Sequence, residues 1–262
     1  MATKRVMLFK TELHPKNNGP HLPFIKLVQQ LVMEVKPELV ITTGTAGGVG
    51  KNLNCGDVVI TDTARLHCKS QYSDYPAIYE LSSQNVELKS GAAFNNKYVN
   101  YAAANFTRLS LPGLYECFQK LTGRAGYSFL KKNTSVPMLY VKGVNSVPGS
   151  QPMDIVSADY LTVDHEYNSE GLQALGIMND TDDAFAAYAM NSLPASKRPK
   201  WLSIRNASEP QVVAPPFPAA TSPSKVIDTL KGLAGPIYGV YQYCTTFNSV
   251  FACWGIIAGM TT

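Results

Sequence analysis

The stretch that most constrains the fold is residues 39–60, which reads LVITTGTAGGVGKNLNCGDVVI. A β-branched apolar run opens it at Leu39–Ile41, and a second such run closes it at Val58–Ile60. Glycine takes positive φ without penalty and lets backbone N–H groups approach a ligand closely. The pattern therefore predicts a buried strand, a glycine turn over Gly44–Gly48 with Thr45 at its tip, and a second strand. Such strand ends are where open α/β sheets bind ligands.

The residues before this stretch predict a βαβ unit. Lys4–Lys10 (KRVMLFK) is typical of a short strand, and Phe24–Lys36 places its apolar residues on one helical face before Pro37 ends the helix. Strand, helix and strand in this order predict a parallel pair with a right-handed crossover.

Downstream, shorter patterns predict the remaining elements of one domain, with loops between Ser70 and Ala104. We expect strands at 138–144 and 200–204, helices at 115–121, 171–175, 181–190, 225–233 and 238–259, and a Pro-rich loop at 211–224. There is no internal repeat and no convincing domain boundary. The fold class expected is α/β, with a central mixed sheet between helices.

Composition excludes several classes of protein. Of the 262 residues, 45% are hydrophobic and 16% charged, which allows a sizeable core. The net charge of +4 is too small and too scattered to indicate nucleic-acid binding. The N-terminus has no long apolar run typical of a secretory signal, so an intracellular, cytoplasmic protein is expected.

One uncharged segment tests this expectation. After Lys231 no charged residue follows, and Ile237–Met260 is long enough to span a bilayer. Its polar content, which includes Gln242 and Asn248, favours a buried C-terminal helix over a membrane span.

The chemistry of metal sites and cofactors leaves no clear motif in the chain. The five cysteines are odd in number and contain no CxxC pair, so reduced and mostly buried thiols are expected. His165 and Glu166 are adjacent rather than i, i+4, which does not suit a metal. There is no P-loop and no GxSxG elbow. We expect neither a cofactor nor a metal.

Four motifs occur in an order that resembles a known family. TGTAGG followed by GDVVITDTARLH is similar to the central signature of the nucleoside phosphorylase / nucleosidase superfamily, closest to its 5'-methylthioadenosine/S-adenosylhomocysteine nucleosidase branch. The similarity continues at Ser157–Asp159, Asp180–Asp182 and Ser203–Glu209. It implies a three-layer αβα sandwich, a small nucleoside-like substrate and cleavage of its N-glycosidic bond. It also implies a homo-oligomer, for which the Tyr- and Asn-rich segment Gln71–Phe106 is a plausible contact.

The resemblance assigns the glycine segment to the sugar or the attacking water. Gly44, Thr45, Ala46 and Gly47 would form this cradle from backbone N–H groups; the alternative is a plain tight turn. Phosphorylases of the family place a phosphate-binding arginine just before the turn, where this chain has Thr42. The change favours hydrolysis over phosphorolysis.

The second motif would bind the base. In the nucleosidases a similar segment stacks an aromatic ring on the purine and reads its edge through the backbone, which here falls on Tyr160, Leu161 and Thr162. Leu161 occupies the stacking position and lacks a ring, so Tyr160 would substitute for it or the base site has changed. The alternative is a strand end with a structural Asp159.

The third motif would hold the ribose. A carboxylate accepts two hydrogen bonds from vicinal hydroxyls and stabilises an oxocarbenium-like sugar. The resemblance assigns this role to Asp182 in the segment Asp180–Thr181–Asp182, with Asp183 as the candidate if the alignment shifts by one. The alternative is a set of charges at the start of a helix.

The fourth motif would protonate the leaving group. The family's aspartate hydrogen-bonds or protonates N7 of the departing purine, and here Glu209 stands at that position with Ser208 to orient it. The alternative is an ordinary surface loop before Pro210.

One departure concerns the start of the family's domain. Members begin with a strand and loop before the segment that matches Lys4–Lys10, so residues 1–262 are expected to form a single domain that lacks them. Those family residues include the water-activating glutamate; Glu12, His14 or His21 could substitute, or each is a plain loop residue. Two alternatives to a glycosidase stay open: an enzyme repurposed for a non-nucleoside substrate, and a non-catalytic binding or storage protein.

Overall fold

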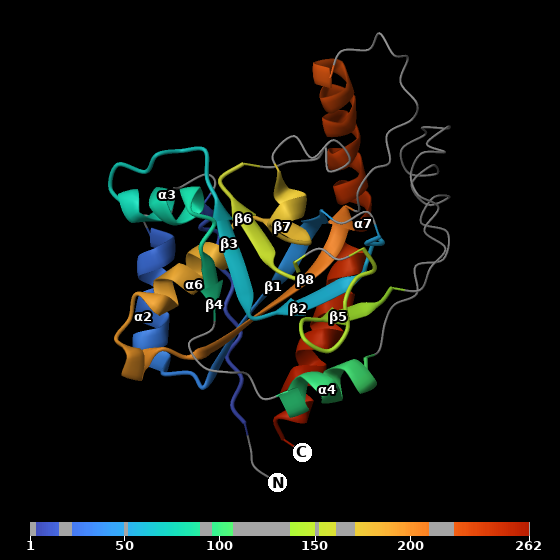
Figure 1. Cartoon of the computed structure of the whole chain (residues 1–262). Helices are drawn as coiled ribbons and strands as arrows, with labels where there is room; N and C mark the ends of the chain where they lie inside the picture. Colours follow the sequence, from blue (N-terminus) through green and yellow to red (C-terminus); the bar gives the residue numbers. More distant parts are fainter. Residues whose placement is uncertain are drawn as a thin grey trace.

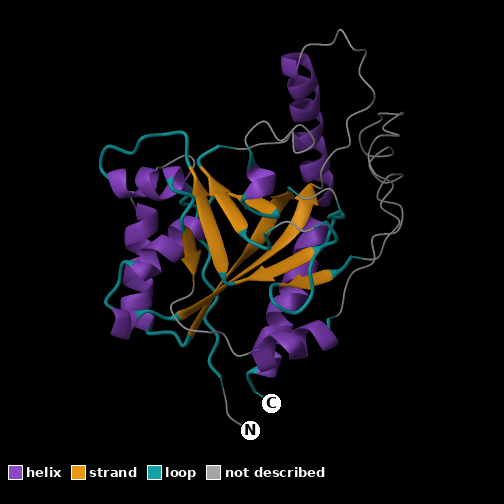
Figure 2. Cartoon of the chain, in the orientation of Figure 1, coloured by secondary structure: helices purple, strands orange, loops and turns teal. Residues whose placement is uncertain are grey.

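A computed structural model gives the architecture of the chain (Figures 1 and 2). It describes residues 4–15, 23–49, 52–89, 96–106, 137–149, 152–160, 171–209 and 223–261. The elements are α2 Pro23–Val35, β1 Leu39–Gly48, β2 Val58–Thr61, β3 Thr63–His67, α3 Pro76–Ser83, β4 Glu87–Lys89, α4 Asn96–Ala104, β5 Leu139–Val141, β6 Ile155–Ala158, η1 Leu172–Ala174, β7 Met178–Asp180, α6 Asp183–Asn191, η2 Ala195–Lys197, β8 Lys200–Glu209 and α7 Pro223–Gly259.

The strands form one mixed sheet of eight, in the order β4-β3-β6-β7-β1-β8-β2-β5. At its centre β1 and β8 run parallel, from the pair Leu39 and Lys200 to the pair Gly47 and Glu209. β2 joins the other edge of β8 in the antiparallel direction. The expected mixed sheet between helices is confirmed.

Helices cover both faces of this sheet and divide the core into two parts (Figure 1). On one face α2 and α6 pack on each other, and α6 contacts β3 and β6; Phe24, Phe185 and Trp201 are buried in this part. On the other face α7 packs against β1, β2 and β8, and α4 packs on α7 and β5; Ile60, Ile204 and Ile256 are buried in this part. The three layers predicted from the family resemblance are therefore present.

The predicted glycine turn is wrong. Residues 39–48 form one continuous strand, and β8 lies between β1 and β2, so the two apolar runs are not partners in a hairpin. The chain passes Gly44–Gly48 with only a register shift against β8 between Ala46 and Gly47. Local glycine content indicated a turn, whereas contacts with strands distant in sequence keep the segment extended.

The predicted strand Lys4–Lys10 is also wrong. The N-terminal segment runs from the start of β1 to the start of α6. Lys4 Nζ is 2.5 Å from Glu38 Oε2, just before β1, and His14 contacts Thr181, just before α6. Residues 4–10 have no regular secondary structure, and Leu8 is 92% exposed. A strand is stabilised by pairing with a neighbour. In the described part of the chain, residues 39–46 of β1 pair with β8 only, so they do not form a ladder with Lys4–Lys10.

The other expectations differ mainly in their boundaries. The helices predicted at 24–36 and 181–190, the short helical piece at 171–175 and the strands at 138–144 and 200–204 are confirmed. The segment expected as loops contains α3, β4 and α4. Residues 115–121, and residues 211–222 of the loop expected at 211–224, lie outside the described residues, whereas Pro223 and Ser224 belong to α7 instead of a loop.

The C-terminal segment is one helix rather than two. α7 is continuous over Pro223–Gly259 and packs on the sheet. Among the described residues, no helix combines the length and the apolar character needed to cross a bilayer. Of the described cysteines, Cys55 and Cys68 are buried free thiols, whereas Cys244 is exposed.

Candidate functional site

The centre of the site is a buried cation, Arg205 on β8, surrounded by three carboxylates. Its Nε lies 2.9 Å from Asp183 Oδ2, and its Nη2 lies 2.7 Å from Asp182 Oδ1 and 3.0 Å from Asp180 Oδ2. Ser203 on the same strand also donates to Asp183. The three aspartates flank the start of α6, so the loop between β7 and α6 is anchored to the central sheet through one guanidinium.

The pKa values of the two buried aspartates of this cluster, Asp180 and Asp183, are shifted in opposite directions. Burial and the neighbouring Asp183 carboxylate raise the pKa of Asp180 well above its usual value. Burial alone would also raise the pKa of Asp183, but attraction to Arg205 and the hydrogen bonds from Arg205 and Ser203 lower it instead. The cluster thus favours the ionised form of Asp183, which pairs with Arg205, more than it favours the ionised form of Asp180.

Gly44 is a glycine because Arg205 lies against it. The two residues are paired across β1 and β8, and a Cβ added to Gly44 would lie 2.8 Å from Arg205 Nη1. Any larger residue would push on a guanidinium that three carboxylates hold in place. Asn206, the next residue on β8, donates to the Gly44 carbonyl oxygen at 3.0 Å.

Three strands meet at Gly47. Its partner on one side is Glu209 at the end of β8, and its partner on the other side is Asn179 on β7. The backbones of the predicted acid and of the segment before Asp182 thus lie on either side of the same glycine. The structure describes the backbone of Glu209 but not its side chain.

The loop that carries Asp180, Thr181 and Asp182 is held from several directions. Ser157 Oγ at the end of β6 donates to Asp180. Thr181 Oγ1 is 2.9 Å from His14 Nε2, a link to the N-terminal segment that the sequence did not predict. Asp182 is the outermost acid: its side chain is 35% exposed, compared with 2% for Asp180 and none for Asp183.

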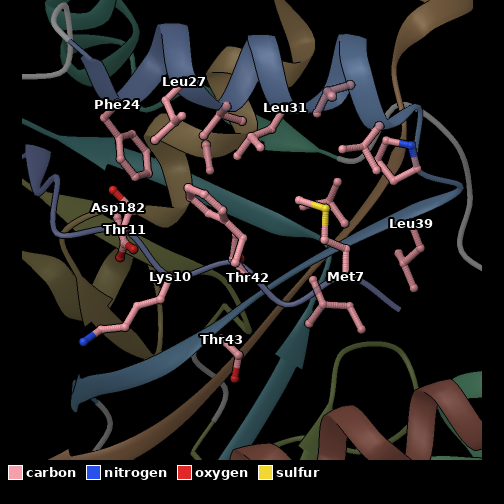
Figure 3. A pocket seen from close by; sticks show the side chains of 18 of the residues that line it. Met7, Lys10, Thr11, Phe24, Leu27, Leu31, Leu39, Thr42, Thr43 and Asp182 are labelled. Atoms are coloured by element: carbon pink, nitrogen blue, oxygen red, sulfur yellow. The ribbon is translucent and has the colours of Figure 1, made fainter. Parts of the chain in front are cut away.

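Asp182 faces a cavity of about 380 Å³ between α2, β1 and the N-terminal segment (Figure 3). Its walls are mostly apolar, with Leu27 and Leu31 of α2 on one side and Leu39 of β1 at one end. Asp182 and Thr11 lie at the other end, with Arg205 in the lining. Among the predicted site residues whose side chains the structure describes, only Asp182 lines this cavity.

The remaining predicted residues are placed as follows. Ser208 is buried and its hydroxyl donates to the Ala46 carbonyl oxygen at 3.4 Å, which links the cradle segment to β8. Tyr160 contacts the end of β3: its hydroxyl is 2.6 Å from His67 Nδ1, and the ammonium of Lys69 lies 4.0 Å from the centre of its ring. Leu161 and Thr162 lie outside the described residues.

Arg205 lies inside the motif Ser203–Glu209, but the motif did not predict a role for it. The sequence does contain a signal: an arginine lies inside an apolar strand pattern at Arg205, and three aspartates lie close together at Asp180, Asp182 and Asp183. A buried arginine needs carboxylate partners, and these were the candidates. Oxygen atoms of Asp180, Asp182 and Asp183 lie within 4.8 Å of one another, a spacing that could hold a cation. Arg205 already supplies the positive charge there, so the expectation of no metal stands as a prediction.

Comparison with known proteins shows local sequence similarity to the phosphorylase superfamily and to nucleosidases. Residues 5–112 match the model of the phosphorylase superfamily, which is less than half of the chain. A 5'-methylthioadenosine/S-adenosylhomocysteine nucleosidase of Haemophilus influenzae is 57% identical over 37 residues, which cover 14% of this chain and only 16% of that protein. The corresponding nucleosidase of Glaesserella parasuis is 54% identical over 37 residues, with the same coverage.

Solved structures extend the likeness to most of the fold. The nucleosidase of the same name from Neisseria meningitidis, in complex with methylthio-immucillin-A, has a TM-score of 0.50 and 15% identity, over 89% of this chain and 74% of that one. The nucleosidase from Colwellia psychrerythraea, in complex with adenine, has a TM-score of 0.51 and 14% identity, over 90% and 73%. The resemblance read from the motifs and the fold class are confirmed.

Proposed function

We propose that this chain, which matches the phosphorylase superfamily over residues 5–112 and shares the nucleosidase fold, cleaves the N-glycosidic bond of a purine nucleoside-like substrate. The observation that carries the proposal is the meeting at Gly47. The backbone of Glu209 pairs with this glycine on one side, and the strand leading to Asp182 pairs with it on the other. An acid for the leaving base and a carboxylate for the sugar would then work on one substrate.

In this mechanism Asp182 binds the sugar. Its Oδ1 is held by Arg205 at 2.7 Å, which orients the carboxylate, while its partial exposure leaves the group accessible to a hydroxyl donor. Negative charge close to C1' stabilises the oxocarbenium-like transition state. Thr181 and Asp180 support Asp182 through their contacts with His14 and Ser157.

Glu209 acts as the general acid. As the bond between C1' and the base nitrogen breaks, its carboxylic acid donates a proton to the purine, and the base leaves uncharged. Water adds to C1' and loses a proton, so that the products are the free base and the free sugar. Ser208, fixed to the Ala46 carbonyl, keeps the end of β8 against the cradle segment Gly44–Gly47.

Water rather than phosphate is the proposed nucleophile. Thr42 replaces the cation that would attract phosphate, and the guanidinium of Arg205 is already engaged by Asp180, Asp182 and Asp183. A cation neutralised by three carboxyl groups gives little attraction to an incoming anion.

The test is to incubate the protein with a panel of purine nucleosides and to measure free base by chromatography, with and without phosphate. We expect release of base at a rate that phosphate does not change. Glu209→Gln keeps the size of the side chain but removes the proton donor, and should lower kcat by about 10²–10⁴-fold.

Glu34→Gln on α2 is the matched control, because Glu34 is exposed and its carboxylate accepts a hydrogen bond from Gln30, one turn away on the same helix. It should leave kcat unchanged. The assignment of Glu209 is wrong if Glu209→Gln releases base as fast as the unmodified protein. No release from any nucleoside would reject the glycosidase proposal itself.

A further inference from the structure

The cavity between α2, β1 and the N-terminal segment extends away from the place where the proposed reaction occurs. Leu39 lines one end of it, and Thr42 and Thr43 line it further along β1. A strand rises about 3.3 Å per residue, so Leu39 to Thr43 spans roughly 13 Å, and Gly47 lies roughly 13 Å beyond Thr43. Most of the cavity is therefore remote from the place where Glu209 pairs with Gly47.

The longest wall of the cavity is an apolar face of α2 (Figure 3). Phe24, Leu27 and Leu31 lie on this wall at intervals of three and four residues, and Val35 continues it by one more turn. At about 1.5 Å per residue, the wall from Phe24 to Val35 is roughly 16 Å long. A narrow apolar space of this length suits an elongated molecule.

The N-terminal segment closes another side of the cavity with alternate residues. Met7 and Phe9 line the cavity, whereas Val6 and Leu8 do not. This is the pattern of an extended chain, in which successive side chains point to opposite sides. Met7 and Phe9 are 55% and 52% exposed, so much of their apolar surface is in contact with water. A ligand in the cavity would cover part of that surface, which is favourable.

The end of the cavity opposite Leu39 is polar. Asp182 and Thr11 lie there (Figure 3). Arg205 Nη2 is 2.7 Å from Asp182 Oδ1 and its Nε is 2.9 Å from Asp183 Oδ2, so at least two carboxylates share one guanidinium. The side chain of Asp182 is 35% exposed, which leaves its carboxylate accessible to a further donor.

The charges at this end determine which head group fits. Lys10 also lines the cavity, but its ammonium is 3.0 Å from Glu12 Oε1, and both side chains are almost fully exposed. An exposed pair of opposite charges contributes little attraction. Carboxylates that outnumber their cation attract a positive group, and an ammonium also donates hydrogen bonds to them. An anionic head group would be repelled by Asp182.

We propose that the cavity binds an amphiphilic amine, which is an unbranched apolar chain that ends in a primary ammonium. The ammonium donates to Asp182 and Thr11, and the chain lies between α2 and β1 toward Leu39. Carbon–carbon bonds are about 1.5 Å long, so a zigzag chain of about ten carbon atoms spans the length of this part of β1. The volume of about 380 Å³ lies in the range of ligand pockets in proteins.

Asp182 also has a place in the proposed reaction, where it binds the sugar. A bound amine would exclude the sugar from this carboxylate and would block release of the base. Binding of the amine requires neither Glu209 nor turnover. Calorimetry on the resting protein therefore tests it separately from the glycosidase proposal.

Isothermal titration calorimetry with hexylamine, octylamine and decylamine, each below the concentration at which it forms micelles, gives the first test. We expect one amine per chain, and a dissociation constant that falls by roughly fourfold per added methylene, as burial of a CH₂ group predicts. Decanoate, with an opposite charge on a similar chain, should bind roughly tenfold more weakly or worse. Equal binding of decanoate, binding of many amines per chain, or no binding of any amine would overturn the proposal.

Two variants locate the site. Leu31→Trp fills the cavity and should weaken decylamine binding by roughly tenfold or more. Its matched control, Met33→Trp, places the same group at an exposed position of α2 that does not line the cavity, and should not weaken binding. Asp182→Asn keeps the shape of the side chain and should weaken binding of decylamine by roughly tenfold, but not that of decanol. Circular dichroism verifies that each variant is folded. Equal effects of the two tryptophan variants, or undiminished binding of decylamine to Asp182→Asn, would show that the amine binds elsewhere.

Discussion

The two halves of β1 belong to one strand but lie in opposite surroundings. The half from Gly44 to Gly48 pairs with β8 up to Gly47 and with β7 at Gly47 and Gly48, and it lies against the buried Arg205. The half from Leu39 to Thr43 pairs with β8 alone and borders the cavity beneath α2. Beside it the N-terminal segment leaves apolar side chains exposed.

One end of β1 therefore lies in a network of polar contacts, and the other end lies beside an open cavity. Charge and hydrogen bonds concentrate at one end of the strand, so substitutions there should be costly. Beside the other end, the side chains of the N-terminal segment are already in contact with water, so substitutions in that segment should cost little. Five substitutions test this contrast.

The largest effect is expected from Arg205→Met. It would leave the buried carboxylate of Asp183, with the partly exposed Asp182 beside it, without a cation. Removing one partner of a buried ion pair typically costs about 3–5 kcal/mol of stability. Chemical denaturation measures the loss. Lys26→Met on the exposed surface of α2 should change stability by no more than about 0.5 kcal/mol. A similar small change for both variants would mean that Arg205 does not hold the β7–α6 loop.

Gly44→Ala should cost about 1–3 kcal/mol, because the new Cβ would displace a guanidinium held by three carboxylates. The control is Gly239→Ala in α7, where an added Cβ meets nothing within 4 Å. It should stabilise the helix, by up to about 1 kcal/mol. Thermal melting gives both values, and their opposite signs are the expected result.

Asp180→Asn tests the charge state of the cluster. The pKa of Asp180 is raised in the fold, so its stabilising contribution is present below the pKa of the unfolded chain and is lost as pH rises through the folded pKa. The asparagine variant avoids this loss, with a slope difference of at most about 1.4 kcal/mol per pH unit. Its stability relative to the unmodified protein should therefore improve as pH rises.

Asp183→Asn should show the opposite trend. The pKa of Asp183 is lowered, so the stability it contributes is present above the unfolded pKa and is lost as pH falls through the folded pKa. Its deficit should therefore be greatest near neutral pH and shrink in acid. Denaturation at several pH values distinguishes the two trends, and parallel profiles for the two variants would contradict the assigned charge states.

The smallest effect is expected from Leu8→Ser, within about 0.5 kcal/mol, because Leu8 is 92% exposed. Leu53→Ala, at a position that is 1% exposed, should cost about 2–5 kcal/mol. Denaturant midpoints compare the two. A large loss for Leu8→Ser would show that the N-terminal segment packs more tightly than its exposure indicates.

Local sequence predicted the elements whose pattern is self-contained. The apolar face of Phe24–Lys36 and the β-branched core of Val58–Ile60 depend on neighbours in sequence, and α2 and β2 form there. Gly44 looked like a turn residue because its real reason, the approach of Arg205 from a distant strand, is not visible locally. The segment Lys4–Lys10 has strand-forming residues but no paired strand in the part of the chain that the structure describes, and composition alone does not show whether such a partner exists.

The site was predicted in part for the same reason. Family motifs identified Asp180–Asp182 and Ser203–Glu209, and the fold brings these segments to one region of the sheet. They did not reveal that Arg205 would be the centre of the cluster, or that His14 would reach Thr181. Both contacts join residues far apart in the chain.

The polar inner side of α7 determines how that helix can move. An apolar helix can slide over an apolar sheet with little penalty, but Asn248 bonds the Gly56 carbonyl and Ser249 bonds Asn206 at single positions. Displacement by one turn, about 5.4 Å, would break both bonds and bury their groups unpaired. These two bonds therefore fix the position of α7 along the sheet. A motion of α7 at this point would have to separate the helix from the sheet instead of sliding it along.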